Sequence, residues 1–235
     1  MLNFTRVLIG LFLLPCCAAA SRSVYFVLAG TGNSGGTGGA TFLMGIGVGL
    51  VLWMAVFVFL PAPVKSYVLA HELTHALWGH LFGATVLGMK VSKTGGNVKL
   101  SESNMFVALA PYFFPLYSIL VICAYFLFSV FFDLQKCHLL FLAAVGFTLG
   151  FHLFFTVSAL ATKQSDIELY GKVFSYALIY FMNALVIGLL VVAVSPVSLV
   201  QFAARLAVDF VEVWRLVWIW SLKLYGATRG AILGL

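Results

Sequence analysis

The stretch Thr41–Leu60, TFLMGIGVGLVLWMAVFVFL, runs for its whole length without a charged side chain. A helix of about 20 apolar residues matches the hydrocarbon thickness of a lipid bilayer. Pro61 and Pro63 follow directly, and proline is poorly tolerated inside a helix, so we expect the helix to end there. This stretch predicts a transmembrane helix.

The composition of the whole chain agrees with that prediction. Of its 235 residues, 63% are hydrophobic and only 9% are charged, which is too apolar for an ordinary soluble domain. Further apolar runs occupy 106–132, 139–160 and 173–194. We therefore expect an all-α polytopic membrane protein with about five to six transmembrane helices.

Charge and cysteine usage exclude other classes of protein. The net charge of +6 comes without a basic cluster interleaved with aromatic residues, so nucleic-acid binding is not indicated. The four cysteines contain no CxxC pair, and they predict neither a disulfide framework nor a cysteine zinc site. The lysines and arginines are spread over nearly every expected loop, so the sequence leaves the membrane orientation open.

The chain beyond the first membrane stretch contains the sequence His71-Glu72-Leu73-Thr74-His75, an HExxH motif. On a helix, residues four apart share a face, so His71 and His75 can hold one Zn²⁺ ion. Glu72 lies beside the first ligand and can act as general base on a zinc-activated water. His80 follows His75 by five positions and is expected to be a polar neighbour only.

A β-hairpin is predicted after the HExxH helix. Residues 89–93 and 97–101 alternate apolar and polar side chains, and Thr94-Gly95-Gly96 lies between them. Such a hairpin can be a plain connection, or it can offer an edge strand to an extended peptide.

A catalytic zinc site usually has three protein ligands and one open position, so the HExxH pair needs a third ligand from elsewhere. Asp166 is the first candidate, because it is a carboxylate at the margin of a membrane helix. His152, deep in an apolar run, is the second, and Glu168 is the third. Asp166 can alternatively serve only to cap the next helix.

Over roughly residues 64–190, the chain resembles the site-2 protease family of intramembrane zinc metalloproteases. The resemblance rests on the HExxH helix, the Gly-Gly hairpin, the Ala110-Pro111 kink and the later Asp166, which follows Gln164-Ser165 in place of the family's Leu-Asp-Gly run. It implies that His71, His75 and Asp166 bind zinc, that Glu72 is the general base, and that the substrate is a transmembrane or membrane-proximal segment of another membrane protein. The loops leave no room for a PDZ insertion, so this would be a minimal member.

These expectations divide the chain into four parts. Residues 1–20 are a signal peptide or a first membrane helix, 21–40 a Gly-rich linker, 41–197 the membrane metalloprotease core, and 198–235 an amphipathic helix lying at the bilayer surface. Alternatively, that last helix is a packed membrane helix whose charged residues form internal ion pairs. Two rival functions stay open: a zincin of another family with Glu168 as ligand, and a non-proteolytic metal-binding or transport protein.

Overall fold

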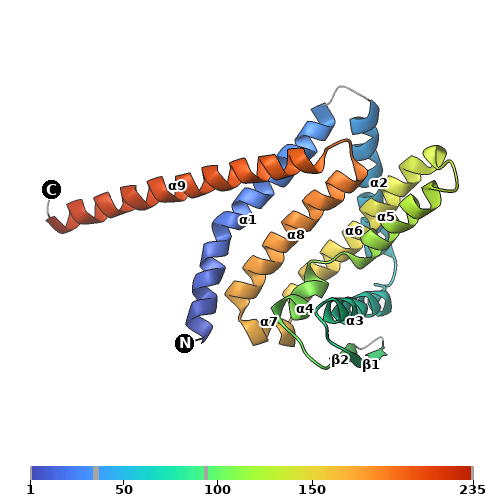
Figure 1. Ribbon diagram of the computed structural model, residues 1–235, viewed down its shortest axis with the longest axis horizontal. Coiled ribbons are helices and arrows are strands. Elements are labelled where there is room, and N and C mark those ends of the chain that lie inside the picture. Colours follow the sequence, from blue (N-terminus) through green and yellow to red (C-terminus); the bar gives the residue numbers. More distant parts are fainter. Residues whose placement is uncertain (1, 34–36, 93–94, 234–235) are drawn as a thin grey trace.

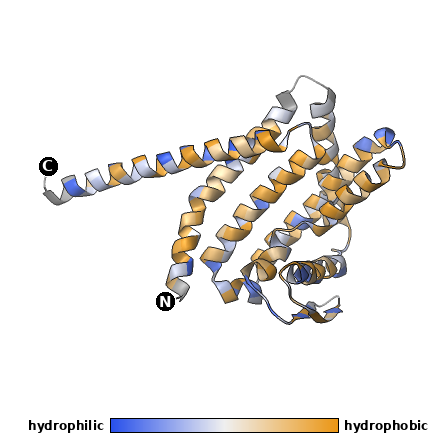
Figure 2. Cartoon of the chain, in the orientation of Figure 1, coloured by the Kyte–Doolittle hydropathy of each residue, from blue (hydrophilic) through white to orange (hydrophobic). Residues whose placement is uncertain are grey.

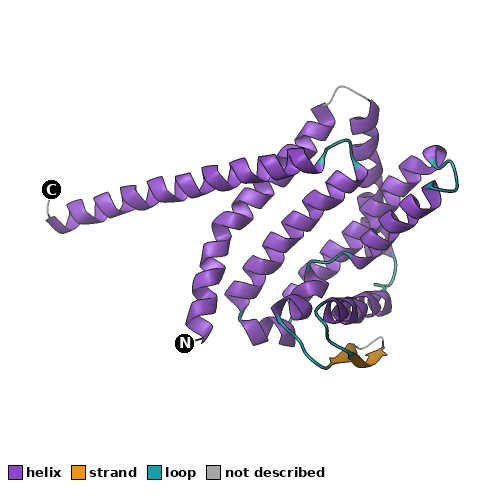
Figure 3. Ribbon diagram, in the orientation of Figure 1, coloured by secondary structure: helices purple, strands orange, loops and turns teal. Residues whose placement is uncertain are grey.

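The computed structural model describes residues 2–33, 37–92 and 95–233. Within them the protein is an all-α polytopic membrane protein with one small hairpin (Figures 1 and 3). The elements in chain order are α1 (Leu2–Asn33), α2 (Thr37–Phe59), α3 (Val64–Leu81), β1 (Val86–Val91), β2 (Gly96–Leu100), α4 (Met105–Leu109), η1 (Ala110–Tyr112), α5 (Leu116–Ser129), η2 (Gln135–Cys137), α6 (His138–Leu160), α7 (Ser165–Tyr170), α8 (Lys172–Val194) and α9 (Leu199–Leu233).

Four of the described helices are long and apolar enough to cross a membrane: α1, α2, α6 and α8. A fifth span results if α4 and α5 are counted together, although the chain bends by 79° between them at the Pro111 to Pro115 segment. The count is thus four or five, and only the higher figure falls within the five to six spans expected from the sequence. The HExxH helix α3 is not among the spans. It lies with the hairpin at one end of the bundle, while Figure 2 shows apolar residues along the bundle helices.

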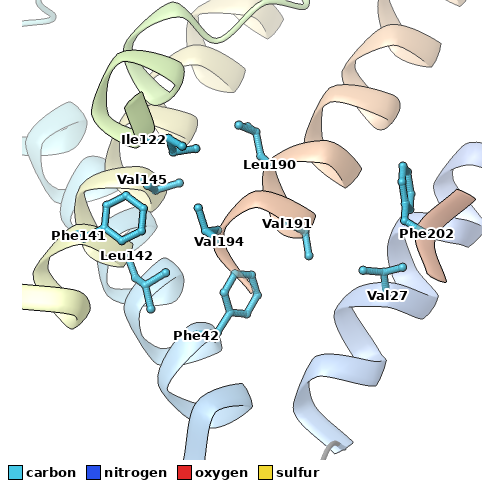
Figure 4. Close-up of a cluster of buried hydrophobic side chains, with 10 residues drawn as sticks. All are labelled: Val27, Phe42, Ile122, Phe141, Leu142, Val145, Leu190, Val191, Val194 and Phe202. Atoms are coloured by element: carbon cyan, nitrogen blue, oxygen red, sulfur yellow. The ribbon is translucent and has the colours of Figure 1, made fainter. Parts of the chain in front are cut away.

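Close helix packing in the bundle depends on glycine. Gly49 of α2 lies against the backbone of Ala143 on α6, and Gly146 of α6 lies against the backbone of Ile46 on α2, so a Cβ at either glycine would clash. Small residues four apart on both helices allow this approach, which is a common way for helices to associate in membranes. A buried apolar cluster fills the space between α1, α2, α5, α6, α8 and the start of α9 (Figure 4).

The hairpin and the proline bend confirm the sequence prediction, while the linker expected at 21–40 differs from it. Helix α3 ends at Leu81 because Gly83 takes a positive φ of 85°, which stops a helix. The expected linker at 21–40 is helical over 21–33 and 37–40, and its residues 34–36 lie outside the described part.

Helix α1 is continuous through the small-residue stretch at which a signal peptide would be cut. Ala19 and Ala20 are fully buried, and Cys17 Sγ lies 3.3 Å from the Ala177 carbonyl of α8. This packing corresponds to the first-membrane-helix alternative for residues 1–20.

Three charged side chains in the first half of α9, Arg205, Asp209 and Glu212, contact α1. Asp209 is fully buried and accepts hydrogen bonds from Ser23 and Arg205, and it pairs with Arg22 at 2.9 Å. Arg22 also pairs with Glu212. The first half of α9 therefore matches the packed alternative with internal ion pairs, while its second half projects from the bundle (Figure 1).

Candidate metal centre

Helix α3 presents the two histidines of the HExxH motif one turn apart. Their Nε2 atoms approach to 3.2 Å, and their rings meet edge to face with centroids 4.8 Å apart. His75 is buried and His71 is half-buried. The sequence prediction that both rings share one face of a helix is confirmed.

Asp166 joins the two histidines from α7. Its Oδ2 lies 3.8 Å from Nε2 of His71 and 3.7 Å from Nε2 of His75. Gly171, with φ of 88°, separates the short α7 from α8, and this break lets α7 lie across the end of the bundle. Among the described residues, these three form the one group of three or more potential ligands that lies close enough to hold a metal ion.

The spacing of the three atoms fits zinc. The nearest point equidistant from the two Nε2 atoms and Oδ2 lies in the plane of these three atoms, about 2.1 Å from each, which is within the usual zinc distances to histidine nitrogen and carboxylate oxygen. The donor set is also suitable, because two imidazoles and one carboxylate leave a fourth position for water or substrate.

Each of these side chains has a partner that fixes its orientation. His75 Nδ1 donates to the Val107 carbonyl at 2.9 Å, which leaves its Nε2 lone pair free to face Asp166. His71 Nδ1 lies 3.4 Å from the Tyr67 hydroxyl. The Tyr112 hydroxyl donates to Asp166 Oδ2 at 3.2 Å. Outer partners of this kind are typical of metal sites.

Tyr112 is itself fixed by polar groups of the membrane helices. Its carbonyl accepts hydrogen bonds from Asn183 Nδ2 at 2.8 Å and from Thr156 Oγ1 at 3.3 Å. His152 Nε2 contacts Asn183 Oδ1 at 3.2 Å. This network explains the polar residues inside α6 and α8, and it gives His152 a partner other than the metal group.

The remaining candidates also lie outside the triad. Glu168 is 43% exposed at its side chain and faces Lys163, with 3.6 Å between the charged atoms. His80 is exposed near the end of α3.

Strand β2 lies directly over Glu72. A Cβ at Gly96 would lie 2.7 Å from Glu72 Oε1 and 2.6 Å from its Cγ. Glycine at position 96 is therefore required for this close approach.

Burial and neighbouring charges shift both carboxyl groups, in opposite directions. Burial is the largest influence on Glu72 and raises its pKa, against the opposing effects of His71 and His75. Burial also works to raise the pKa of Asp166, but the two facing imidazoles outweigh it and hold that pKa below its usual range.

A cavity of about 820 Å³ opens between the triad and the hairpin. One wall consists of Tyr67, His71, Glu72 and His75 on α3, and the opposite wall consists of β2 from Gly96 to Leu100. Asp166 and Leu169 close a third side. Its size suits a peptide segment and its polar lining admits water.

Sequence reasoning did not find Tyr112, Asn183 or Gly96 as parts of this site. Asn183 carried a signal, because a polar residue inside a membrane helix marks a functional or structural contact. No sequence pattern indicated Tyr112 or Gly96 as part of the site, because their contacts with Asp166 and Glu72 depend on which segments of the fold lie opposite them.

Comparison of the chain with protein-family models, curated proteins and solved structures gave no match.

Proposed function

We propose that this protein is an intramembrane zinc metalloprotease of the site-2 protease type. The observation that carries the proposal is the convergence of His71 Nε2, His75 Nε2 and Asp166 Oδ2 from two separate helices onto one point at zinc distance. A zinc ion bound there would polarise a peptide carbonyl and bring the pKa of a bound water near 7.

Glu72 has the position and the environment of a general base. It follows the first ligand on α3, and it is buried beside the cavity. Its raised pKa makes it a better proton acceptor than an exposed glutamate. Glu72 would take the proton from the attacking water and deliver it to the leaving amine.

The cavity and its wall support the proposed substrate class, an unwound segment of a membrane protein. A peptide bond can reach Glu72 only in an extended conformation, because a helix hides its carbonyl groups in its own hydrogen bonds. Strand β2 forms one wall of the cavity and belongs to a sheet of two strands, so a locally unwound membrane segment could add to it as a further strand.

The first test is the zinc content of detergent-purified protein. We expect about one zinc per chain for the wild type and a loss of zinc in Asp166→Ala. Glu168→Ala and His152→Ala are matched controls on the two rejected ligands, and both should retain zinc. A wild type that stays free of zinc after metal loading would remove the basis for the proposed activity.

The second test separates proteolysis from simple metal binding or transport. Glu72→Gln should retain zinc and abolish cleavage of single-span membrane substrates, because the amide cannot accept the proton. Equal cleavage by Glu72→Gln would refute the assigned role. The transport alternative requires further ligating groups along a pathway, and the described residues contain one such group only.

A further inference from the structure

Strand β2 runs along helix α3 in the same direction, and close contacts at its two ends give the register. A Cβ at Gly96, the first residue of the strand, would lie 2.6 Å from Glu72 Cγ and 2.7 Å from Val68 Cγ1. At the last residue of the strand, Leu100 Cδ1 lies 2.8 Å from the position that a Cβ of Gly79 would take. Gly96 therefore lies over the proposed general base, and Leu100 lies about two helical turns further along α3.

Lys99 lies on the other face of the strand. Successive side chains of a β-strand point to opposite faces, and Val98 and Leu100 are half-buried while Lys99 is exposed. Lys99 nevertheless lines the cavity of about 820 Å³ beside the metal triad. Apart from the triad and Glu72, it is the one charged residue among the described residues that line this cavity.

The structure gives Lys99 no acidic partner. None of the ion pairs formed among the described residues includes Lys99. The two carboxylates of the cavity are engaged elsewhere, because Asp166 faces the histidines and Glu72 lies under Gly96. The cavity wall therefore carries a positive charge that no described carboxylate neutralises.

The hairpin leaves one edge of β2 for a further strand. Strand β1 pairs along the first edge, with Lys90 opposite Asn97 and Met89 opposite Val98. The sheet has two strands within the described residues, so no third strand occupies the second edge. An extended peptide added at that edge would place each side chain on the same face as the β2 residue directly opposite it.

We propose that Lys99 selects substrates that carry an acidic side chain at the residue directly opposite it in the added strand. This inference rests on the proposed function and specifies the substrate class further. Opposite charges directly across two strands attract one another, whereas like charges repel. The residues on either side of the acidic one would lie opposite Val98 and Leu100 and face α3, where apolar side chains fit.

The register also fixes where the acidic residue lies relative to the cut. The bond to be cut must lie near Glu72, which is beside Gly96, and Lys99 follows Gly96 by three residues. Paired strands keep the same spacing per residue. The acidic residue is therefore expected about three residues from the cut bond, on the amino side if the added strand is antiparallel to β2 and on the carboxyl side if it is parallel.

The test uses detergent-purified, zinc-loaded full-length protein and a set of synthetic single-span peptides. All peptides share one apolar sequence with a central pair of glycines, which favours local unwinding. One glutamate is moved along this sequence residue by residue, and a parallel set carries lysine instead. Mass spectrometry identifies the cut bond, and initial rates give kcat/KM. For the wild type we expect glutamate about three residues from the cut bond to raise kcat/KM about two- to fivefold over lysine at that position.

A charge reversal provides the decisive comparison. Lys99→Glu should invert the ratio of kcat/KM between the glutamate and lysine peptides, and a ratio is independent of any general loss of activity. Lys90→Glu is the matched control, because Lys90 lies on β1 and β2 separates it from the open edge. It should keep the wild-type ratio.

Two outcomes would refute different statements. If Lys99→Glu keeps the wild-type ratio, or if the preference has no fixed spacing from the cut bond, the role of Lys99 is overturned while the proposed proteolysis stands. If the zinc-loaded wild type cuts no peptide above the level of Glu72→Gln, the proposed function itself fails, and the role of Lys99 fails with it.

Discussion

The Tyr112 hydroxyl offers a sharp test of how the candidate metal centre is held together. Tyr112→Phe removes one oxygen atom, and with it the hydrogen bond to Asp166 Oδ2 at 3.2 Å. The phenyl ring retains its edge-to-face contact with His71, at a centroid distance of 5.3 Å. The substitution thus frees the carboxylate to rotate without removing a ligand.

The expected loss follows from the length of that bond. Removal of an outer partner commonly lowers metal affinity by about 10- to 100-fold. Because 3.2 Å is long for a hydroxyl–carboxylate bond, we expect the lower end, about tenfold, or about 1.4 kcal/mol. Zinc affinity is measured by competition with a chromophoric chelator, together with the thermal unfolding midpoint.

Tyr117→Phe is the matched control. Its hydroxyl donates to the Ser66 carbonyl at 2.9 Å, which is a stronger bond by distance but makes no contact with the triad. It should leave zinc affinity unchanged. The reasoning is refuted if Tyr112→Phe binds zinc as tightly as the wild type, or if both variants lose affinity equally.

Three further predictions concern the hairpin, the ionic contact and the first helix. Gly96→Ala should lower proteolytic activity at least tenfold with zinc retained, because its Cβ would displace Glu72. Gly88→Ala is the control, because a Cβ there has no neighbouring atom within 4 Å, and it should match the wild type in the same assay. Asp209→Asn should destabilise the protein by about 2–4 kcal/mol in detergent unfolding, because it leaves Arg205 and Arg22 without their buried partner. The side chain of Glu212 is 40% exposed, so Glu212→Gln should lower the stability by less than about 1 kcal/mol. Equal losses in that pair would contradict the assignment. A tryptic peptide that spans Ala20 and Ser21 should be found by mass spectrometry of the purified protein, and a mature protein whose first residue is Ser21 would contradict the prediction.

The amino-acid sequence by itself determined the elements whose structure is local. A charge-free run of bilayer length predicts a membrane helix wherever it occurs, and helical periodicity places His71 and His75 together without further information. Alternation around Gly95-Gly96 likewise predicted the hairpin. Helical periodicity also placed Glu72 beside the two histidines.

Tertiary structure alone decided everything that depends on contacts between distant segments. Asp166 meets the histidines only because α7 lies across the end of the bundle, and sequence reasoning could rank it above His152 and Glu168 but could not place it. The charged face of α9 looked suited to water or headgroups, yet Asp209 is buried against Arg22 of α1. The lysines and arginines look scattered along the chain, yet most of those in the described connections lie at one end of the bundle, because the packing of the helices decides which connections share an end.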